Sequence, residues 1–243
     1  MQLIIDLGNT QIKYFVFDQD RELKALKTVV NQWESALNEI LNAFPQLNKA
    51  ILSDVNGSIT SELIAFLAPI PVVNCSASLR LPFKTQYNPS KQLGADRVAL
   101  IASAAFHYPN QNVLVIDVGS CITYDFLDRE GIHHGGSISP GFSMRYKAMH
   151  TFSGKLPLLE PKASNDFFGT DTASAMHAGV YSGIQSEIET MIGLYQKKFG
   201  FLTIILTGGD AQRLPKPLKN SIFAHSNFIA KGLNFILSSN IDS

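Results

Sequence analysis

A polar insert interrupts an apolar run near the N-terminus. The segment IIDLGNTQIKYFVFD (4–18) is typical of a β-strand except at Asp6, Gly8, Asn9 and Thr10. Aspartate, glycine and small polar residues are depleted from strands and are common in tight turns. Such a turn supplies backbone N–H groups and a carboxylate at its base, which could bind phosphate and a metal ion. An ordinary β-hairpin turn explains this segment equally well when it is taken alone.

A similar turn recurs in the second half of the chain. The segment DVGSCITYDFLD (117–128) repeats the Asp-x-Gly pattern of DLGNTQIKYFVFD (6–18) within an apolar hairpin. Two copies of one element indicate a duplicated α/β domain. If the halves face each other across a cleft, Asp6 and Asp117 both point into it, and two opposed carboxylates predict a bound cation. A third glycine turn, LTGGD (206–210), could pack against a flat ring such as adenine or could be an ordinary strand-to-helix turn.

The composition indicates a globular protein without a strong electrostatic field. The chain has 243 residues, of which 45% are hydrophobic, and its 20 basic and 20 acidic residues give a formal net charge of zero. We therefore expect no attraction to nucleic acid or to an anionic membrane. No apolar run approaches the ~18 residues of a transmembrane helix, and the N-terminus does not resemble a signal peptide, so we expect a cytoplasmic protein. Cys75 and Cys121 lack zinc or redox spacing and are expected to be reduced and structural.

Strand-like and helix-like segments alternate along both halves. Apolar residues at steps of three and four predict helices, and short apolar runs bounded by turn residues predict strands. Helices are expected over 33–44, 61–67, 95–108, 172–198 and 227–237. Beyond the two hairpins, strands are expected over 49–55, 71–74, 131–140 and 201–207. Because the pattern restarts at the second hairpin, we expect one domain at 1–110 and another at 111–243.

Seven short motifs carry a resemblance to a known family. They are DLGNT (6–10), YNP (87–89), GADR (94–97), DVGS (117–120), GGSISPG (135–141), GTDT (169–172) and LTGG (206–209). In this order they resemble the type III pantothenate kinases, which belong to the superfamily of acetate and sugar kinases, actin and heat-shock chaperone ATPases. Neither a Walker A sequence nor a dinucleotide-binding G-x-G-x-x-G is present. The resemblance implies an α/β fold of duplicated ribonuclease H-like domains that face each other across a nucleotide cleft.

The resemblance also implies an activity and a nucleotide site. The reaction would be ATP-dependent phosphorylation of pantothenate to 4'-phosphopantothenate, the first step of coenzyme A biosynthesis. Asp117 would bind a monovalent cation, K⁺ or NH₄⁺, and Asp6 is a candidate ligand of the Mg²⁺ that accompanies ATP. The ATP-binding residues implied are Asp6, Leu7, Gly8, Asn9, Thr10, Gln11, Ile12, Lys13 and Ser120.

On the substrate side, the resemblance implies that Asp96 is the general base. Asp96 lies in the first turn of a predicted helix, where the helix dipole favours an ionised carboxylate. Without the resemblance, a carboxylate that caps this helix and pairs with Arg97 is the simpler interpretation. Pantothenate would lie against Tyr87, Gly94, Ala95, Asp96 and Arg97, and Thr172 would close the pocket, with the other subunit of a homodimer as one source of this threonine.

Two residues depart from the family pattern. Ser120 stands where threonine is usual and keeps the hydroxyl group, whereas Asp171 stands where asparagine is common and adds a negative charge beside Thr172. A pair of adjacent histidines, His133 and His134, lies on a predicted strand. Neighbouring side chains on a strand point to opposite faces, so this pair is not expected to share a metal ion.

Two other functions remain open at this point. One is a catalytically idle regulatory protein, since the same family includes members first described as accessory factors for transcription. The other is a kinase of the superfamily that acts on a different small acceptor. Retention of all the carboxylates considered above weighs against the first, and GADR preceded by YNP weighs against the second.

Overall fold

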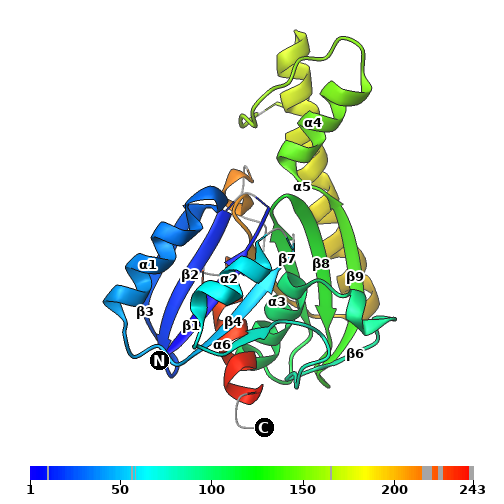
Figure 1. The fold of residues 1–243 in the computed structure, drawn as a ribbon. Helices are drawn as coiled ribbons and strands as arrows, with labels where there is room; N and C mark the ends of the chain where they lie inside the picture. The colour runs from blue at the N-terminus through cyan, green and yellow to red at the C-terminus, as the bar shows by residue number, and fades with distance from the viewer. Residues whose placement is uncertain are drawn as a thin grey trace. The chain divides into compact units, whose positions relative to one another are not determined.

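The computed structural model describes residues 1–9, 11–55, 57, 59–164, 166–214 and 227–240, together with the backbone of 221–223. The chain divides into two compact units, and Figure 1 labels most of their helices and strands. The first unit comprises Met1–Pro109, Gly131–His133 and the described residues from Asn227 onward. The second comprises Asn110–Glu130 and the described residues between His134 and Phe223.

The first unit contains a five-stranded sheet of order β3-β2-β1-β4-β5. β1 (Gln2–Leu7), β2 (Gln11–Asp18) and β3 (Arg21–Val29) form an antiparallel meander. β4 (Lys49–Asp54) pairs in parallel with β1, and β5 (Val72–Asn74) pairs in parallel with β4. Every residue of β1 is buried, as expected for a central strand with helices on both faces of its sheet.

Helices cover this sheet on both faces. Leu3 and Ile5 of β1 share one apolar cluster with Leu37 of α1 (Trp33–Ala43) and Leu63 of α2 (Thr60–Leu67). Side chains alternate along a strand, so Ile4 lies on the opposite face. α3 (Ala95–His107) and α6 (Phe228–Asn240) pack against each other, α3 contacts β4, and α6 contacts both β1 and β4. Short 3-10 turns at Val30–Gln32 and Ser90–Gln92 precede α1 and α3.

The position of α6 corrects the expected domain ranges. The first unit ends its main segment at Pro109, near the expected boundary, but α6 belongs to this unit and not to a domain at 111–243. Its apolar stripe, which includes Leu233 and Ile236, is fully buried. The amide of Asn234 donates a 2.8 Å hydrogen bond to the carbonyl of Gln19, which fixes the helix at the β2–β3 turn.

The second unit contributes most of a six-stranded sheet of order β11-β10-β7-β8-β9-β6. β7 (Val113–Val118) and β8 (Cys121–Leu127) form an antiparallel hairpin. β10 (Thr203–Thr207) pairs in parallel with β7, and β11 (Ser221–Phe223) with β10. β9 (Ile132–Pro140) continues the sheet, and the two-residue β6 (Lys84–Thr85) pairs with β9 at residues that cluster with the first unit.

Two helices pack on the core of the second unit. α4 (Phe142–Phe152) and α5 (Thr172–Phe199) place Tyr146 and Ile184 in one apolar cluster with Tyr124 of β8. A short 3-10 turn at Ala211–Arg213 follows β10. Each unit thus starts with an antiparallel hairpin whose first strand pairs in parallel with a later strand, which is the repeated element that the sequence predicts.

Two further properties bear on the class of protein. None of the helices within the described ranges is both long and apolar enough to cross a bilayer. Cys75 is buried, Cys121 is half-buried, and both are free thiols.

Candidate active site

The first hairpin turn connects β1 to β2 and places Asp6 opposite Lys13. The ammonium nitrogen of Lys13 lies 3.1 Å from Oδ2 of Asp6, and the Asp6 residue is only 8% exposed. Inside the turn, the N–H of Gly8 donates to the carbonyl of Gln11 at 3.0 Å. The turn therefore presents one buried carboxylate and one cation side by side.

The other residues predicted around this turn differ in what they can contribute. The side chains of Leu7 and Ile12 are fully buried in the core, so only their backbone groups are available to a ligand. Asn9 and Gln11 are exposed. Thr10, which the sequence also predicts to bind ATP, lies outside the described residues.

Two polar residues next to this turn were not predicted as site residues from the sequence. In the parallel pairing of β1 with β4, Ser53 stands opposite Asp6 and Asp54 opposite Leu7. Ser53 is fully buried, and its hydroxyl oxygen has no hydrogen-bond partner among the described residues. Asp54 accepts hydrogen bonds from the N–H of Gly57 at 2.8 Å and from the hydroxyl of Thr60. The sequence signal that could have identified Ser53 and Asp54 is their position as a polar pair at the end of the apolar run KAILSD.

Asp96 lies in the first turn of α3 and is half-buried. Its Oδ1 accepts a 2.8 Å hydrogen bond from the N–H of the next residue, Arg97. The pKa of the Cys75 thiol is raised to about 12. The largest cause is burial, followed by the charges of Asp96 and Asp6. Both carboxylates thus lie within electrostatic range of the same buried thiol.

Tyr87 and Arg97 form a second contact beside Asp96. The guanidinium carbon of Arg97 lies 5.2 Å from the centre of the Tyr87 ring, within the range of a cation–π interaction. Arg97 is 4% exposed, whereas Tyr87 is half-buried. Gly94 and Ala95 start the same helix, and the Ala95 carbonyl lies 3.6 Å from the sulfur of Cys75. The predicted substrate residues of the first unit thus belong to one local assembly.

In the second unit, Asp117 lies near the end of β7, and Ser120 lies in the turn that follows this strand. Asp117 pairs with Thr123 of β8 and Thr207 of β10. The N–H of Gly119 donates to the carbonyl of Cys121 at 2.9 Å. This turn is shorter than the first, because two residues separate β7 from β8 whereas three separate β1 from β2.

Two glycine-rich loops pack against this second turn. The N–H of Gly141 donates to the carbonyl of Ser120 at 3.0 Å, and the N–H of Asp210 donates to the carbonyl of Val118 at 2.9 Å. Gly208 has a φ of +102°, and a Cβ there would lie 2.5 Å from Oδ1 of Asp117. The motifs DVGS, GGSISPG and LTGGD therefore meet, and they bring carboxylate and carbonyl oxygens together.

This oxygen-rich surrounding suits a hard cation. The described residues contain no group of three or more histidine, cysteine or acidic side chains that could hold a metal ion. Such a cluster is not needed for nucleotide-bound Mg²⁺, which takes one or two carboxylates and completes its shell with phosphate and water. The carboxylate of Asp6 and the neighbouring Ser53 hydroxyl fit that requirement.

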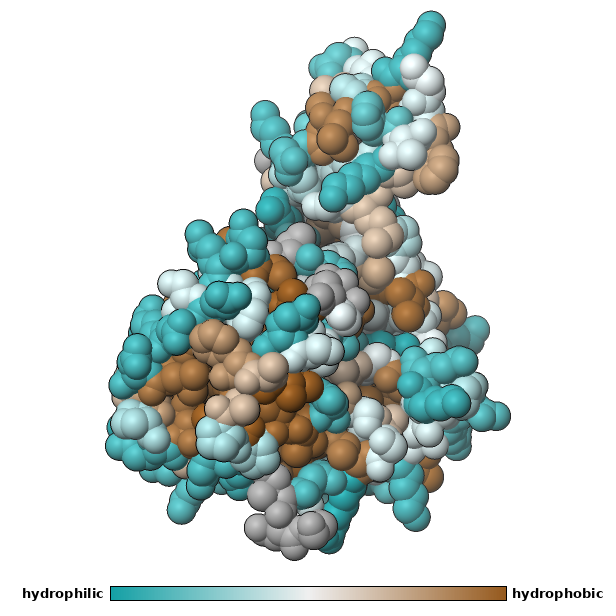
Figure 2. Space-filling view, in the orientation of Figure 1, coloured by the Kyte–Doolittle hydropathy of each residue, from teal (hydrophilic) through white to brown (hydrophobic). Residues whose placement is uncertain are grey.

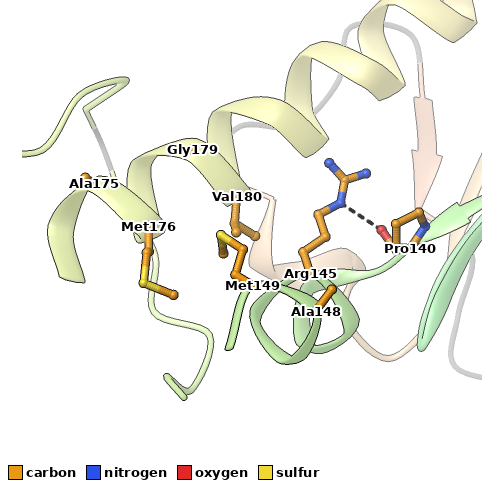
Figure 3. Close-up of a pocket in the computed structure, with 8 residues that line it drawn as sticks. All are labelled: Pro140, Arg145, Ala148, Met149, Ala175, Met176, Gly179 and Val180. Atoms are coloured by element: carbon orange, nitrogen blue, oxygen red, sulfur yellow. Dashed lines mark hydrogen bonds between the residues drawn. The ribbon is translucent and has the colours of Figure 1, made fainter. Parts of the chain in front are cut away.

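A polar network that the sequence did not reveal supports the loop at Pro140. Arg145 of α4 donates from Nε to the carbonyl of Pro140 at 2.8 Å and forms an ion pair with Glu187 of α5 (Figure 3 shows the Pro140 bond). Glu187 also accepts hydrogen bonds from Tyr124, at 2.9 Å, and from Ser139. The pKa of Glu187 is lowered overall. Burial, the largest single cause, would raise it, but the hydrogen bonds from Ser139, Arg145 and Tyr124 together outweigh burial.

A cavity of about 360 Å³ lies between α4 and α5 next to this network. Met149, Met176 and Val180 line it with apolar side chains (Figure 3). None of the residues predicted to bind ATP or pantothenate lines this cavity, so we do not assign it to the active site.

Asp171, one of the two departures from the family pattern, caps α5. Its side chain accepts the N–H of Ser174 at 2.9 Å, and the Ser174 hydroxyl accepts the N–H of Asp171 at 3.1 Å. The hydrogen bonds from Ser174 lower the pKa of Asp171. Its charge therefore stabilises the start of the helix, which places the exposed Thr172 as the first helical residue.

Comparison with known proteins identifies the family. Residues 2–193 match the family described as "Type III pantothenate kinase". The chain belongs to the type III pantothenate kinase family. A protein of that name from Christiangramia forsetii is 44% identical over 241 residues, 99% of each chain. Another from Bacteroides fragilis is 39% identical over 243 residues, 99% of this chain and 98% of the relative. The family predicted from the seven motifs is confirmed.

Solved structures with low sequence identity show the fold. A Campylobacter jejuni protein described as a candidate Baf family transcriptional activator superposes with a TM-score of 0.66 at 24% identity and covers 99% and 100% of the two chains. The activator of 2-hydroxyisocaproyl-CoA dehydratase from Clostridium difficile gives a TM-score of 0.55 at 11% identity and covers 97% and 93%. The predicted α/β fold of duplicated ribonuclease H-like domains is confirmed, and a nucleotide cleft between them stays a prediction.

Proposed function

We propose that this chain transfers the γ-phosphoryl group of ATP to the primary hydroxyl of pantothenate, with Asp96 as the general base. Membership of the type III pantothenate kinase family makes the chain a phosphotransferase with an alcohol acceptor that acts in coenzyme A biosynthesis. One observation supports the residue assignment. Asp96, at the start of α3, lies beside the Tyr87–Arg97 contact, in the same unit as the Asp6–Lys13 turn.

In this proposal Asp96 orients the pantothenate hydroxyl and accepts its proton. Phosphoryl transfer has a loose transition state, so positioning of the nucleophile and stabilisation of charge on the phosphoryl oxygens carry most of the catalysis. The position of Asp96 in the first turn of α3 stabilises its negative charge through the helix dipole. Its bond to the N–H of Arg97 fixes the orientation of the carboxylate.

The residues from Asp6 to Lys13 bind the ATP phosphates, and Ser120 contacts them from the second turn. The N–H groups of the first turn and the ammonium of Lys13 are donors suited to phosphate oxygens. Asp6 would hold the Mg²⁺ that accompanies ATP, and Asp117 would hold a monovalent cation, K⁺ or NH₄⁺. These cations would supply positive charge to the phosphoryl oxygens. The Clostridium difficile structure of the same fold contains bound ADPNP, which supports a nucleotide site.

Pantothenate lies against Tyr87 and the start of α3. Arg97 carries a guanidinium suited to the pantothenate carboxylate, and Gly94 and Ala95 offer backbone groups at the helix start. Thr172 closes the pocket from the other subunit of a homodimer. Exposed Phe152, Phe167 and Phe168, at 88%, 81% and 61%, support self-association through the second unit. Figure 2 shows hydrophobic surface among hydrophilic residues on the part of this unit that contains α4. A cytoplasmic location stays a prediction.

The direct test is release of ADP that depends on pantothenate. Purified protein with Mg²⁺, ATP and K⁺ or NH₄⁺ should turn over when pantothenate is added and should be silent without it. Absence of turnover under these conditions would contradict the proposal and favour a catalytically idle regulatory role. Competition with other small hydroxyl and carboxylate acceptors tests the second alternative, because a preferred acceptor other than pantothenate would replace the substrate assignment.

A further inference from the structure

His133 is a fully buried histidine that the proposed mechanism does not use. It lies on β9 and has no exposed surface. Its neighbour His134 is exposed and lies 2.6 Å from a carboxylate oxygen of Asp128. The two imidazoles thus have separate environments, as the alternation along a strand predicts.

His133 contacts Tyr87 in two ways. Its ring stacks on the Tyr87 ring, with 6.5 Å between ring centres and 11° between planes. Its Nδ1 also lies 2.9 Å from the hydroxyl oxygen of Thr85, and that same oxygen accepts the N–H of Tyr87 at 3.0 Å. One buried side chain therefore restrains both the ring and the backbone of Tyr87.

The surroundings of His133 fix its own orientation. Phe83, which is 7% exposed, meets the imidazole edge-on at 6.1 Å with an angle of 82° between planes. The pairing of β6 with β9 places Thr85 opposite His133, and the N–H of Gln86 donates to the His133 carbonyl at 2.9 Å. Ring packing, strand pairing and a side-chain hydrogen bond therefore hold His133 next to the segment that leads to Tyr87.

Tyr87 passes this restraint to the proposed substrate site. The guanidinium carbon of Arg97 lies 5.2 Å from the centre of the Tyr87 ring, and Arg97 follows Asp96 at the start of α3. A shift of the Tyr87 ring would change the face on which the guanidinium rests. A buried, rigid partner for a half-buried aromatic ring is the arrangement that preorganises a binding site.

We propose that His133 is a positioning residue for pantothenate: it holds Tyr87, and through Tyr87 the Arg97 guanidinium, in the orientation that receives the substrate. This inference rests on the proposed function, which assigns Tyr87 and Arg97 to pantothenate. His133 itself touches neither ATP nor the reacting atoms in this proposal. Its loss should therefore affect the KM for pantothenate and leave the KM for ATP unchanged.

The first test compares His133→Asn with the matched control His134→Asn. The His133 variant removes the stacked ring. It should raise the KM for pantothenate about tenfold, which corresponds to the upper end of the interaction energy of an aromatic pair. The KM for ATP should stay within about twofold of the wild-type value. The control changes the same residue type one position away and should leave both constants unchanged. An equal rise in both KM values, or an unchanged KM for pantothenate in an active and folded variant, would overturn the inference.

A second test asks whether His133 acts through Tyr87. In a Tyr87→Ala background, His133→Asn should cause no further rise in the KM for pantothenate, because coupled residues are not additive. A further rise of about tenfold would show an independent role and overturn the inference. Should His133→Asn fail to fold, His133→Phe keeps a stacked ring and should retain a KM for pantothenate within about threefold of the wild type. Loss of pantothenate affinity in folded His133→Phe would also overturn it.

The wild-type assay separates the two proposals. If the wild-type protein shows no ADP release that depends on pantothenate, the proposed function fails. If the wild type is active and the His133 variants match it in KM for pantothenate, only the positioning role fails.

Discussion

The ammonium of Lys13 lies 3.1 Å from the carboxylate of Asp6 across the first hairpin. In this arrangement each group neutralises the other. In the proposed site, a bound phosphate would compete with Asp6 for Lys13 and would leave the Asp6 carboxylate available to the accompanying Mg²⁺.

Lys13→Met should weaken ATP binding without loss of the fold. The variant removes a donor to the phosphates, and a hydrogen bond to a charged group contributes about 1.5–3 kcal/mol, so we expect a rise of roughly tenfold to a hundredfold in the KM for ATP. Steady-state kinetics with varied ATP measures this. Lys24→Met is the control, because Lys24 lies on β3 and forms an exposed ion pair with Glu39 at 3.4 Å. Equal effects of the two substitutions would exclude Lys13 from the nucleotide site.

Asp96→Asn should abolish most turnover and leave stability near that of the wild type. The amide oxygen of asparagine can still accept the N–H of Arg97, but it cannot accept the substrate proton, and general base catalysis contributes about 10²–10⁴-fold. Measured kcat should fall within that range while the unfolding midpoint stays unchanged. Asp20→Asn, which alters an exposed carboxylate, should leave both kcat and the unfolding midpoint unchanged. An active Asp96→Asn enzyme would refute the assignment of the base.

Gly208→Ala should destabilise the second turn, whereas Gly209→Ala should be tolerated. A Cβ at Gly208 would lie 2.5 Å from Oδ1 of Asp117 and collide with the Val118 carbonyl, at a φ of +102°. Within the described part of the chain, no heavy atom lies within 4 Å of a Cβ at Gly209. We expect a loss of about 2 kcal/mol or more in the free energy of unfolding for Gly208→Ala, measured by denaturant titration. Dependence of turnover on K⁺ should weaken in the same variant, and equal stability of both variants would contradict the close approach.

Glu187→Gln should lower stability at neutral pH more than at acidic pH. The folded protein lowers the pKa of Glu187 below its usual 4.5, so its contribution is present above that value and is lost as the pH falls through the folded pKa. At pH 7 the loss should be about 1–3 kcal/mol, and the gap to the wild type should narrow below pH 4.5. Chemical denaturation across this pH range provides the measurement. Glu189→Gln, on the exposed side of α5, is the control, and a gap independent of pH would show that the charge of Glu187 is not involved.

Much of the fold could be predicted because apolar periodicity and turn motifs are properties of short stretches of sequence. The apolar periodicity of α1, α3 and α5 and the two Asp-x-Gly hairpins identify these elements within a few residues of their observed ends. The strand β3 was missed because its residues are only partly buried and carry no clear apolar alternation. β6 has two residues, too few for any periodic signal.

Tertiary partners could not be predicted from the same signals. The apolar stripe of α6 shows that the helix is buried, but not that α3 and β1 cover it. Glu187 is one polar residue among several on a long helix, and only the fold brings Tyr124, Ser139 and Arg145 to it. In the site, Asp6 and Asp117 were found through their Asp-x-Gly elements and Asp96 through the family resemblance, while Ser53 is defined by strand register with Asp6.

The return of α6 to the first unit also affects how this unit folds. α6 contacts β1 and β4, yet the segments of the second unit lie between these strands and α6 in the chain. α3 also packs against β4 and against α6, so α6 joins a helix that is much closer to the strands in sequence. Bringing distant segments together costs loop-closure entropy. We conclude that a long-range closure, and not local contacts alone, completes the first unit.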